Sequence, residues 1–206
     1  MRVLARCIFD DARPIEGTLA QRYFESRELW SVARLVDDIR FHPRCPFGTE
    51  RGMAVVVAMR HVVSNAITAV QRIQLNRQGR KIAKGMMLGS ASGAAMKLQQ
   101  LQDGDLHICE GLETGLATIA MDRGPLWALG STSLIQSFPV LDGVRRLVIW
   151  ADFDPVDPRT GRQPGFHAAD LCAERWLCAG REALVLQPRQ EGSDEADVWS
   201  SRCGRL

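Results

Sequence analysis

The sequence predicts an α/β protein. A mostly parallel four-stranded sheet with flanking helices is expected at residues 105–206, preceded by a smaller α+β subdomain at residues 1–104. Apolar runs and helical segments alternate regularly in the second region, which is the pattern of a parallel sheet with crossover helices. The first region instead contains a long β-branched run followed by a hairpin partner. A chain of 206 residues, 46% of them hydrophobic, is long enough for two small domains with a core each.

The pattern of the first region predicts one helix and then a strand pair. Thr18 has a side chain suited to an N-cap, and Pro43 and Pro46 are expected to break the chain because proline lacks a backbone donor. The apolar run GMAVVVAM is typical of a buried strand. In chain order we expect a helix at 18–27, a break at 43–46, strands at 52–59 and 66–75, and a Gly-rich loop at 89–93.

The second region is predicted to alternate strands with helices. The run RRLVIWAD is its strongest strand pattern, and Gly180 is a suitable C-cap for its longest helix. In such a sheet, ligands bind beyond the carboxyl ends of the strands. We expect strands at 106–110, 125–130, 145–152 and 182–187, and helices at 112–122, 133–138 and 166–180.

Three acidic residues fall at the carboxyl ends of the predicted strands. Glu110 ends the first strand, Asp152 ends the third, and Asp154 follows two residues later, so that both aspartates point to one side of an extended chain. Carboxylate oxygens are ligands that Mg²⁺ prefers, and a bound metal would neutralise a phosphate during its transfer. Gly111, directly after Glu110, allows the backbone to turn sharply.

Each of these acids also has a purely structural explanation. Glu110 can stabilise the N-terminus of the helix that follows it, where negative charge is favourable. Asp152 and Asp154 can belong to a polar turn, because Asp-Pro pairs are common in turns. The occurrence of all three at the strand ends of one sheet favours the metal site.

Basic residues concentrate in the middle of the chain. Residues 51–100 hold eight of the 26 Lys and Arg and none of the 24 Asp and Glu. This distribution predicts a surface for a polyanion, with exposed strand faces and loops as the alternative explanation. The Gly-rich loop lacks the GK[ST] ending of a P-loop, which argues against an ATPase. The residues expected to bind nucleic acid are Arg72, Arg77, Arg80, Lys81, Lys84 and Lys97.

No segment of the sequence indicates export or membrane insertion. An acidic pair stands where a signal peptide needs an apolar run, and no stretch approaches the roughly 18 apolar residues of a membrane span. The six cysteines fit neither a disulfide framework nor a paired zinc site. We therefore expect a cytoplasmic protein without a membrane partner.

The run HICEGLETGLA, followed about forty residues later by LVIWADFD, resembles the Toprim domain of primases, topoisomerases and nucleases. That family has Glu-Gly after its first strand and Asp-x-Asp after its third, and Glu110, Asp152 and Asp154 match these positions. The resemblance implies that Glu110 acts as a general acid or base. It also implies that all three acids contribute to a site for Mg²⁺ or Mn²⁺.

The resemblance extends along most of the chain. ALGST looks like the glycine turn after the second Toprim strand, with Gly130 as its turn residue. The last helix and strand, the preceding N-terminal segment and the run GSDEADVW resemble the phage and plasmid branch of these proteins. That run makes Asp194 and Asp197 candidate outer metal ligands, with a solvated tail as the alternative. The usual short turn after Asp-x-Asp is expanded here to DFDPVDPRTGRQPG.

The resemblance implies a primase-like nucleotidyltransferase that acts on DNA, with a single-stranded template and nucleoside triphosphates as partners. Its domains would be a nucleic-acid groove at 1–104 and a catalytic domain at 105–206. The sequence contains no zinc-binding module and no helicase, so a helicase or a zinc-binding protein is an expected further partner. A Toprim metal-dependent nuclease and a non-catalytic nucleic-acid-binding protein of a mobile element are the alternatives.

Overall fold

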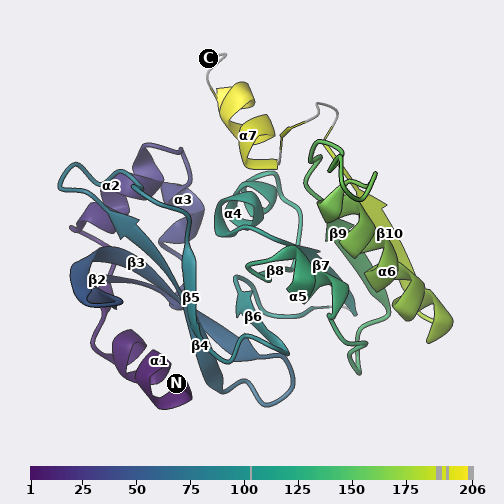
Figure 1. Ribbon diagram of the computed structural model, residues 1–206, viewed down its shortest axis with the longest axis horizontal. Coiled ribbons are helices and arrows are strands. Elements are labelled where there is room, and N and C mark those ends of the chain that lie inside the picture. The colour runs from purple at the N-terminus through teal and green to yellow at the C-terminus, as the bar shows by residue number, and fades with distance from the viewer. Residues whose placement is uncertain (103, 189–191, 194, 204–206) are drawn as a thin grey trace. The chain divides into compact units, whose positions relative to one another are not determined.

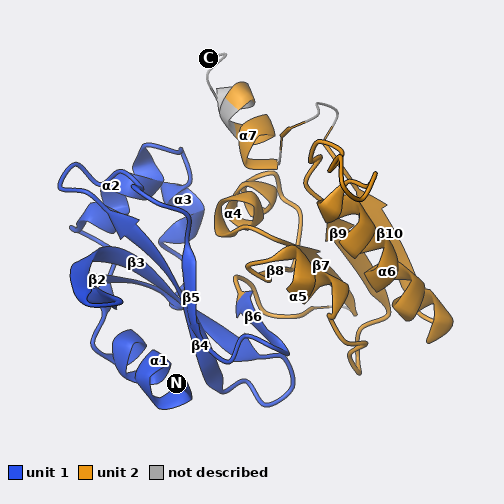
Figure 2. Cartoon of the chain, viewed as in Figure 1, with its two compact units in different colours: residues 1–96 blue, residues 97–206 orange. Residues whose placement is uncertain are grey.

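The computed structural model describes residues 1–102, 104–188, 192–193 and 195–203. The chain forms two compact units, residues 1–96 and 97–206, each with its own helices and strands (Figure 1, Figure 2). The predicted mixed α/β class is confirmed. Elements that begin in the first unit are α1 (Arg2–Asp10), β1 (Arg13–Pro14), α2 (Leu19–Glu25), α3 (Trp30–Ala33), β2 (Ile39–Phe47), β3 (Glu50–His61), β4 (Ile67–Leu75), β5 (Met86–Gly89) and β6 (Ala94–Lys97).

An antiparallel sheet centred on β3 organises the first unit. The hairpin predicted from the β-branched run is confirmed, since β3 pairs with β4 and places Val56 opposite Arg72. Val56 is fully buried, and α1 covers this face of the sheet with Ile8 and Phe9. Thr18 caps α2 as expected, because its Oγ1 accepts the backbone N–H of Ala20 (3.1 Å).

The break expected at the two prolines is wrong, because strand β2 continues through them. Its pairing with β3 shifts register between His42 and Cys45, on either side of Pro43. Such an irregularity releases a residue from the ladder, so that a residue without an N–H donor is tolerated within the strand.

The second unit contains a parallel sheet with the strand order β8-β7-β9-β10. The strands and helices predicted for this region are confirmed within a few residues at their ends. A further helix, α7, follows them. The elements are β7 (Asp105–Cys109), α4 (Leu112–Ala120), β8 (Leu126–Ala128), α5 (Thr132–Gln136), β9 (Arg146–Trp150), α6 (Pro164–Cys178), β10 (Glu182–Leu186) and α7 (Glu195–Cys203).

The neighbours β7 and β9 form a topological switch point. The chain leaves β7 through α4 toward β8, and it leaves β9 through α6 toward β10, on the other side of the sheet order. Since such crossovers are right-handed, α4 and α6 cover opposite faces. Their contacts agree, because α4 packs with α7 whereas α6 packs with α5 and runs along β9 and β10 (Figure 1). Ligands of open parallel sheets bind at the carboxyl edge beside such a point.

Membrane-spanning helices are absent from the described part of the chain, since none of its helices combines sufficient length with sufficient apolar character.

A hydrogen bond between β7 and β9 makes the stability of the second unit sensitive to pH. The indole Nε1 of Trp150 donates to Nδ1 of His107 (3.1 Å). Burial lowers the pKa of His107, and the nearby Asp105 offsets this only in part. The folded unit therefore keeps an uncharged imidazole that accepts the indole proton at Nδ1.

We expect the free energy of unfolding to decrease as the pH falls below about 6.5, where the histidine of the unfolded chain takes up a proton that the folded chain excludes. His107→Gln retains an acceptor and removes the titration. Thermal unfolding at about pH 7.5 and about pH 5.5 should show a smaller decrease of Tm for this variant than for the parent. His42, whose pKa burial also lowers, accounts for a remaining decrease. Equal decreases in the two proteins would contradict this role of His107.

Candidate functional site

The carboxyl edge of the parallel sheet carries the predicted acids. Cys109 lies opposite Trp150 in the β7–β9 ladder, so Glu110 and Asp152 follow the two strands at the same edge. The backbone N–H of Gly130 donates to the carbonyl of Glu110 (2.8 Å), which brings the end of β8 to this edge as well. Gly130 has φ +87°, a conformation that favours glycine.

Glu110 is half-buried and is separated from the first residue of α4 by Gly111 alone. Gly111 is the N-cap of that helix in an extended conformation (φ −89°), so its role does not depend on a positive φ. A Cβ at this position would lie 3.0 Å from the hydroxyl of Thr114. Because glycine has no Cβ to crowd this hydroxyl, residue 111 can cap α4 and the helix can begin two residues after the glutamate.

The two aspartates of the Asp-x-Asp motif are held by α6 and by the end of β10. Oδ2 of Asp154 accepts the backbone N–H of Gly165 (3.0 Å) in the first turn of α6. The side-chain amide of Gln187 donates to the backbone carbonyl of Asp152 (3.3 Å). Oδ1 of Asp152 is shielded from solvent. A Cβ on Gly165 would lie 2.9 Å from Oδ2 of Asp154 and 3.0 Å from the carbonyl of Asp152.

The segment before α7 is tied to the same motif. Phe153 donates its N–H to the carbonyl of Ser193 (3.1 Å) and accepts the N–H of Gly192 (2.5 Å). The segment that leads into α7 is therefore hydrogen-bonded to the backbone of the Asp-x-Asp motif shortly before the helix begins. Asp197 is exposed in the first turn of that helix, and Asp194 lies outside the described residues.

The carboxylates share an edge but do not form a ready metal cluster. Within the described ranges, no three His, Cys, Asp or Glu side chains are grouped closely enough to hold an ion. Carboxylates without a cation repel one another, since two unit charges 4 Å apart near a protein surface interact with about 4 kcal/mol. The donor chemistry nevertheless fits Mg²⁺ or Mn²⁺, because the predicted ligands are carboxylates and Mg²⁺ retains several waters when few protein ligands bind it.

Family comparison agrees with the architecture of this unit. Residues 105–204 match the Toprim domain. Residues 1–98 match a domain of unknown function (DUF7146), and no curated protein matches the chain.

Solved primases share the fold of nearly the whole chain. The primase fragment of the bacteriophage T7 primase-helicase protein is 15% identical with a TM-score of 0.56, and the match covers 95% of this chain and 70% of that one. The Aquifex aeolicus primase, with its zinc-binding and RNA polymerase domains, is 15% identical with a TM-score of 0.64 over 99% and 59% of the two chains. The DnaG primase catalytic domain bound to single-stranded DNA is 13% identical with a TM-score of 0.60 over 95% and 74%. These similarities establish a DnaG-type fold.

Arg72 does not belong to an exposed basic surface as expected, because its side chain is packed inside the first unit. It is 4% exposed, its Nη1 donates to the carbonyl of Pro46, and its guanidinium lies 5.1 Å from the ring of Phe47. The contact with β2 explains this position, since a buried guanidinium needs polar and aromatic partners. Arg72 therefore stabilises the β2–β4 packing.

The remaining predicted basic residues differ in exposure. The side chains of Arg77, Arg80, Lys81 and Lys84 are exposed in the segment between β4 and β5. Asn76 shapes this segment, because its Oδ1 accepts the N–H groups of Gln78 (3.0 Å) and Arg80 (2.9 Å). Lys97 is half-buried, with its ammonium 4.5 Å from the ring centre of Trp127.

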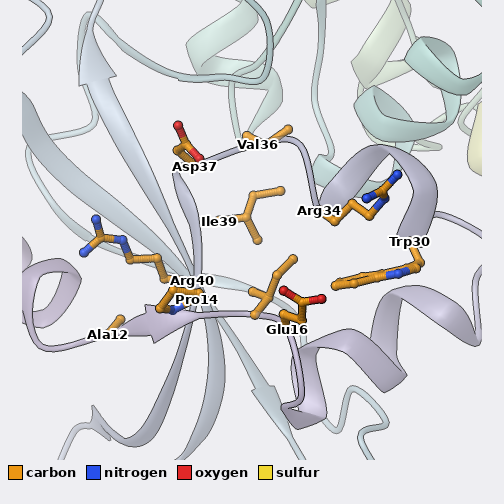
Figure 3. Close-up of a pocket in the computed structure, with 10 residues that line it drawn as sticks. Ala12, Pro14, Glu16, Trp30, Arg34, Val36, Asp37, Ile39 and Arg40 are labelled. Atoms are coloured by element: carbon orange, nitrogen blue, oxygen red, sulfur yellow. The ribbon is translucent and has the colours of Figure 1, made fainter.

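A pocket of about 510 Å³ lies in the first unit, away from the basic segment in sequence (Figure 3). Figure 3 shows Trp30 and Arg34 on one side of this pocket and Arg40 on the other. Arg40 is held by the ring of Phe9 at 4.1 Å and donates to its carbonyl (3.2 Å). Two acids, Glu16 and Asp37, balance the two arginines of the lining, so the charge of this pocket does not favour an anion.

We expect Gly165→Ala to destabilise the Toprim domain although alanine favours helices. The helix gain of about 1 kcal/mol is smaller than the cost of overpacking, about 1–3 kcal/mol, against the Asp152 carbonyl and the Asp154 carboxylate. Thermal and urea unfolding should therefore show a lower stability. Asp170→Ala, on an exposed position of the same helix, is the control and should leave stability within about 0.5 kcal/mol. A stabilised Gly165→Ala protein would show that α6 does not approach the motif closely.

Proposed function

We propose that this chain is a metal-dependent, primase-like nucleotidyltransferase that acts on DNA. The observation that carries the proposal is the β7–β9 register, which puts Glu110 and the Asp-x-Asp motif at the carboxyl edge of a Toprim domain, beside its topological switch point. The match of primase folds to both units supports primer synthesis over nuclease activity, because the similarity includes the first unit and is not confined to the Toprim domain.

The roles in this proposal follow the chemistry of each side chain. Asp152 and Asp154 would hold Mg²⁺ or Mn²⁺, with Glu110, Asp194 and Asp197 as further ligands. The bound ion would supply charge neutralisation for the phosphates of the incoming nucleotide. The Glu110 carboxyl accepts or returns the proton of the attacking hydroxyl, a task for which a half-buried carboxylate is suited.

The first unit would supply the nucleic-acid-binding surface, with residues 1–104 as the binding domain and 105–206 as the catalytic domain. Four exposed basic side chains between β4 and β5 support this assignment. A single-stranded template agrees with the DnaG catalytic domain, which was solved with such a strand. The protein would belong to the phage and plasmid branch and act in the cytoplasm.

A zinc-binding protein or a helicase would complete the activity. The chain spans about three fifths of the Aquifex primase, whose structure also contains a zinc-binding domain. The T7 fragment comes from a protein that joins primase to helicase. In this proposal, a second protein supplies the zinc-binding domain or the helicase.

We expect the purified chain, with labelled nucleoside triphosphates, single-stranded DNA and Mg²⁺ or Mn²⁺, to form short oligonucleotides. Asp152→Ala should abolish the product, and Glu110→Gln should reduce its rate by about 100-fold or more, the usual contribution of a general acid or base. Asp170→Ala, an exposed acid of α6 outside the motif, should leave the rate unchanged.

The same gel separates the alternatives. Cut template that disappears with Asp152→Ala would identify a nuclease instead. The absence of any metal-dependent product, even when a zinc-binding protein and helicase are added, would leave a non-catalytic nucleic-acid-binding protein.

We expect the exposed segment between β4 and β5 to set the salt dependence of DNA binding. Arg77→Gln and Arg80→Gln should each make the negative slope of log K against log salt less steep by about 0.7, the value for one phosphate contact on a single strand. Arg6→Gln, on the exposed face of α1, is the charge-matched control and should not change the slope. Fluorescence anisotropy with a labelled oligonucleotide at several salt concentrations measures these slopes, and equal slopes for all four proteins would exclude the segment as the binding surface.

A further inference from the structure

The expanded loop after the Asp-x-Asp motif builds a pocket of about 510 Å³ within the Toprim domain. The loop closes on itself, because Asp157 donates its N–H to the carbonyl of Arg162 (2.9 Å) and accepts the N–H groups of Thr160 and Gly161 at its own carbonyl (3.2 and 2.8 Å). It is therefore an ordered wall of the pocket. Helix α5 and the first turns of α6 supply the other walls.

Hydroxyl and basic side chains dominate the polar lining of this loop pocket. Arg162 and His167 are adjacent, with Nη1 and Nε2 2.8 Å apart. Since a guanidinium only donates, Nε2 of the imidazole is the acceptor, and this bond uses one of the five N–H donors of Arg162. The hydroxyl groups that line the pocket belong to Thr132, Ser133 and Thr160.

The one carboxylate among the described lining residues is already engaged within the loop. Oδ1 of Asp157 accepts the backbone N–H of Arg159 (2.8 Å), and the guanidinium of Arg159 lies 3.6 Å away. The negative charge of Asp157 is therefore already paired with Arg159 of the same loop. Arg162 is not needed to neutralise it, and the net character of the pocket favours an anion.

The loop pocket adjoins the acidic motif through the first turn of α6. Pro164 lines the pocket, and the next residue, Gly165, donates its N–H to Asp154. An anion in the pocket would therefore lie beside the residues to which the metal site is assigned. Its charge would be stabilised further by the N-terminal end of a 15-residue helix.

We propose that the loop pocket is a phosphate-binding subsite in which Arg162 and His167 hold a phosphate group next to the Asp-x-Asp motif. Hydroxyl donors together with a fork-shaped guanidinium are the groups that recognise phosphate oxygens. The inference rests on the proposed function for the identity of the substrate. The phosphate belongs either to the triphosphate of a nucleotide or to the backbone of the DNA strand.

The test measures binding by the full chain in a chelator, so that a metal does not contribute. Isothermal titration uses inorganic tripolyphosphate, ATP, and a deoxyoligonucleotide without terminal phosphates as three separate probes. We expect Arg162→Gln to weaken at least one probe about tenfold, the usual effect of losing a charge-assisted phosphate contact. Arg145→Gln removes the same charge at an exposed position of the second unit, outside the pocket lining, and should change affinity by less than about twofold.

The pattern across probes identifies the source of the phosphate. Selective loss of tripolyphosphate and ATP binding assigns the subsite to the nucleotide, and selective loss of oligonucleotide binding assigns it to the strand. His167→Gln repeats the measurement if Arg162→Gln alters the circular dichroism spectrum. The proposal is overturned if no probe binds the parent chain, or if the pocket variants and Arg145→Gln behave alike.

The subsite and the proposed function can fail separately. Asp152→Ala should keep its affinity for the probes in chelator, since this binding does not need the metal. If the parent chain synthesises primers but Arg162→Gln does not weaken binding, the subsite is rejected and the proposed function is retained. If the pocket binds phosphate but no metal-dependent product forms, the proposed function is rejected and the subsite is retained.

Discussion

Parallel pairing of β7 with β9 is the constraint on which the rest of the candidate site depends. It places Glu110 and Asp152, which are far apart in sequence, at one edge of the sheet. Because the connections after the two strands leave toward opposite faces, the space beyond their ends is not covered by a single crossover. A shift of this register by one residue would move the acids relative to each other and turn the strand side chains to the other face.

The second unit was predictable because two of its strands, β8 and β9, are buried on both faces. Their apolar residues therefore form continuous runs, and helices separate the strands of this unit at short intervals. The Glu-Gly and Asp-x-Asp motifs directly follow the apolar residues of β7 and β9, so a single short segment predicts both the strand and the acids at its carboxyl end. Helix α7 was not expected from local pattern, since its position depends on Phe153 and on packing with α4.

The first unit was less predictable because tertiary contacts decide several of its residues. Pro43 indicates a break locally, but the pairing of β2 with β3 resumes beyond it through a register shift. Arg72 has a side chain suited to binding phosphate, yet the aromatic ring of Phe47 and the carbonyl of Pro46 hold it inside the first unit. Helix α1 gains its stability from apolar contacts with the sheet, which no single turn of its sequence indicates.

The acids and the loop pocket are linked through the N-terminus of α6. One oxygen of Asp154 is committed to the N–H of Gly165, which fixes the carboxylate and leaves its other oxygen for a cation. The same helix end begins at Pro164, a residue of the pocket wall, so an anion in the pocket and a cation at the motif would be positioned by one rigid element. Opposite charges so placed stabilise each other, whereas the acids without a cation repel. Under the proposed function, the carboxylates would gather around the ions that the site receives, and the backbone of β9 and α6 would determine where those ions meet.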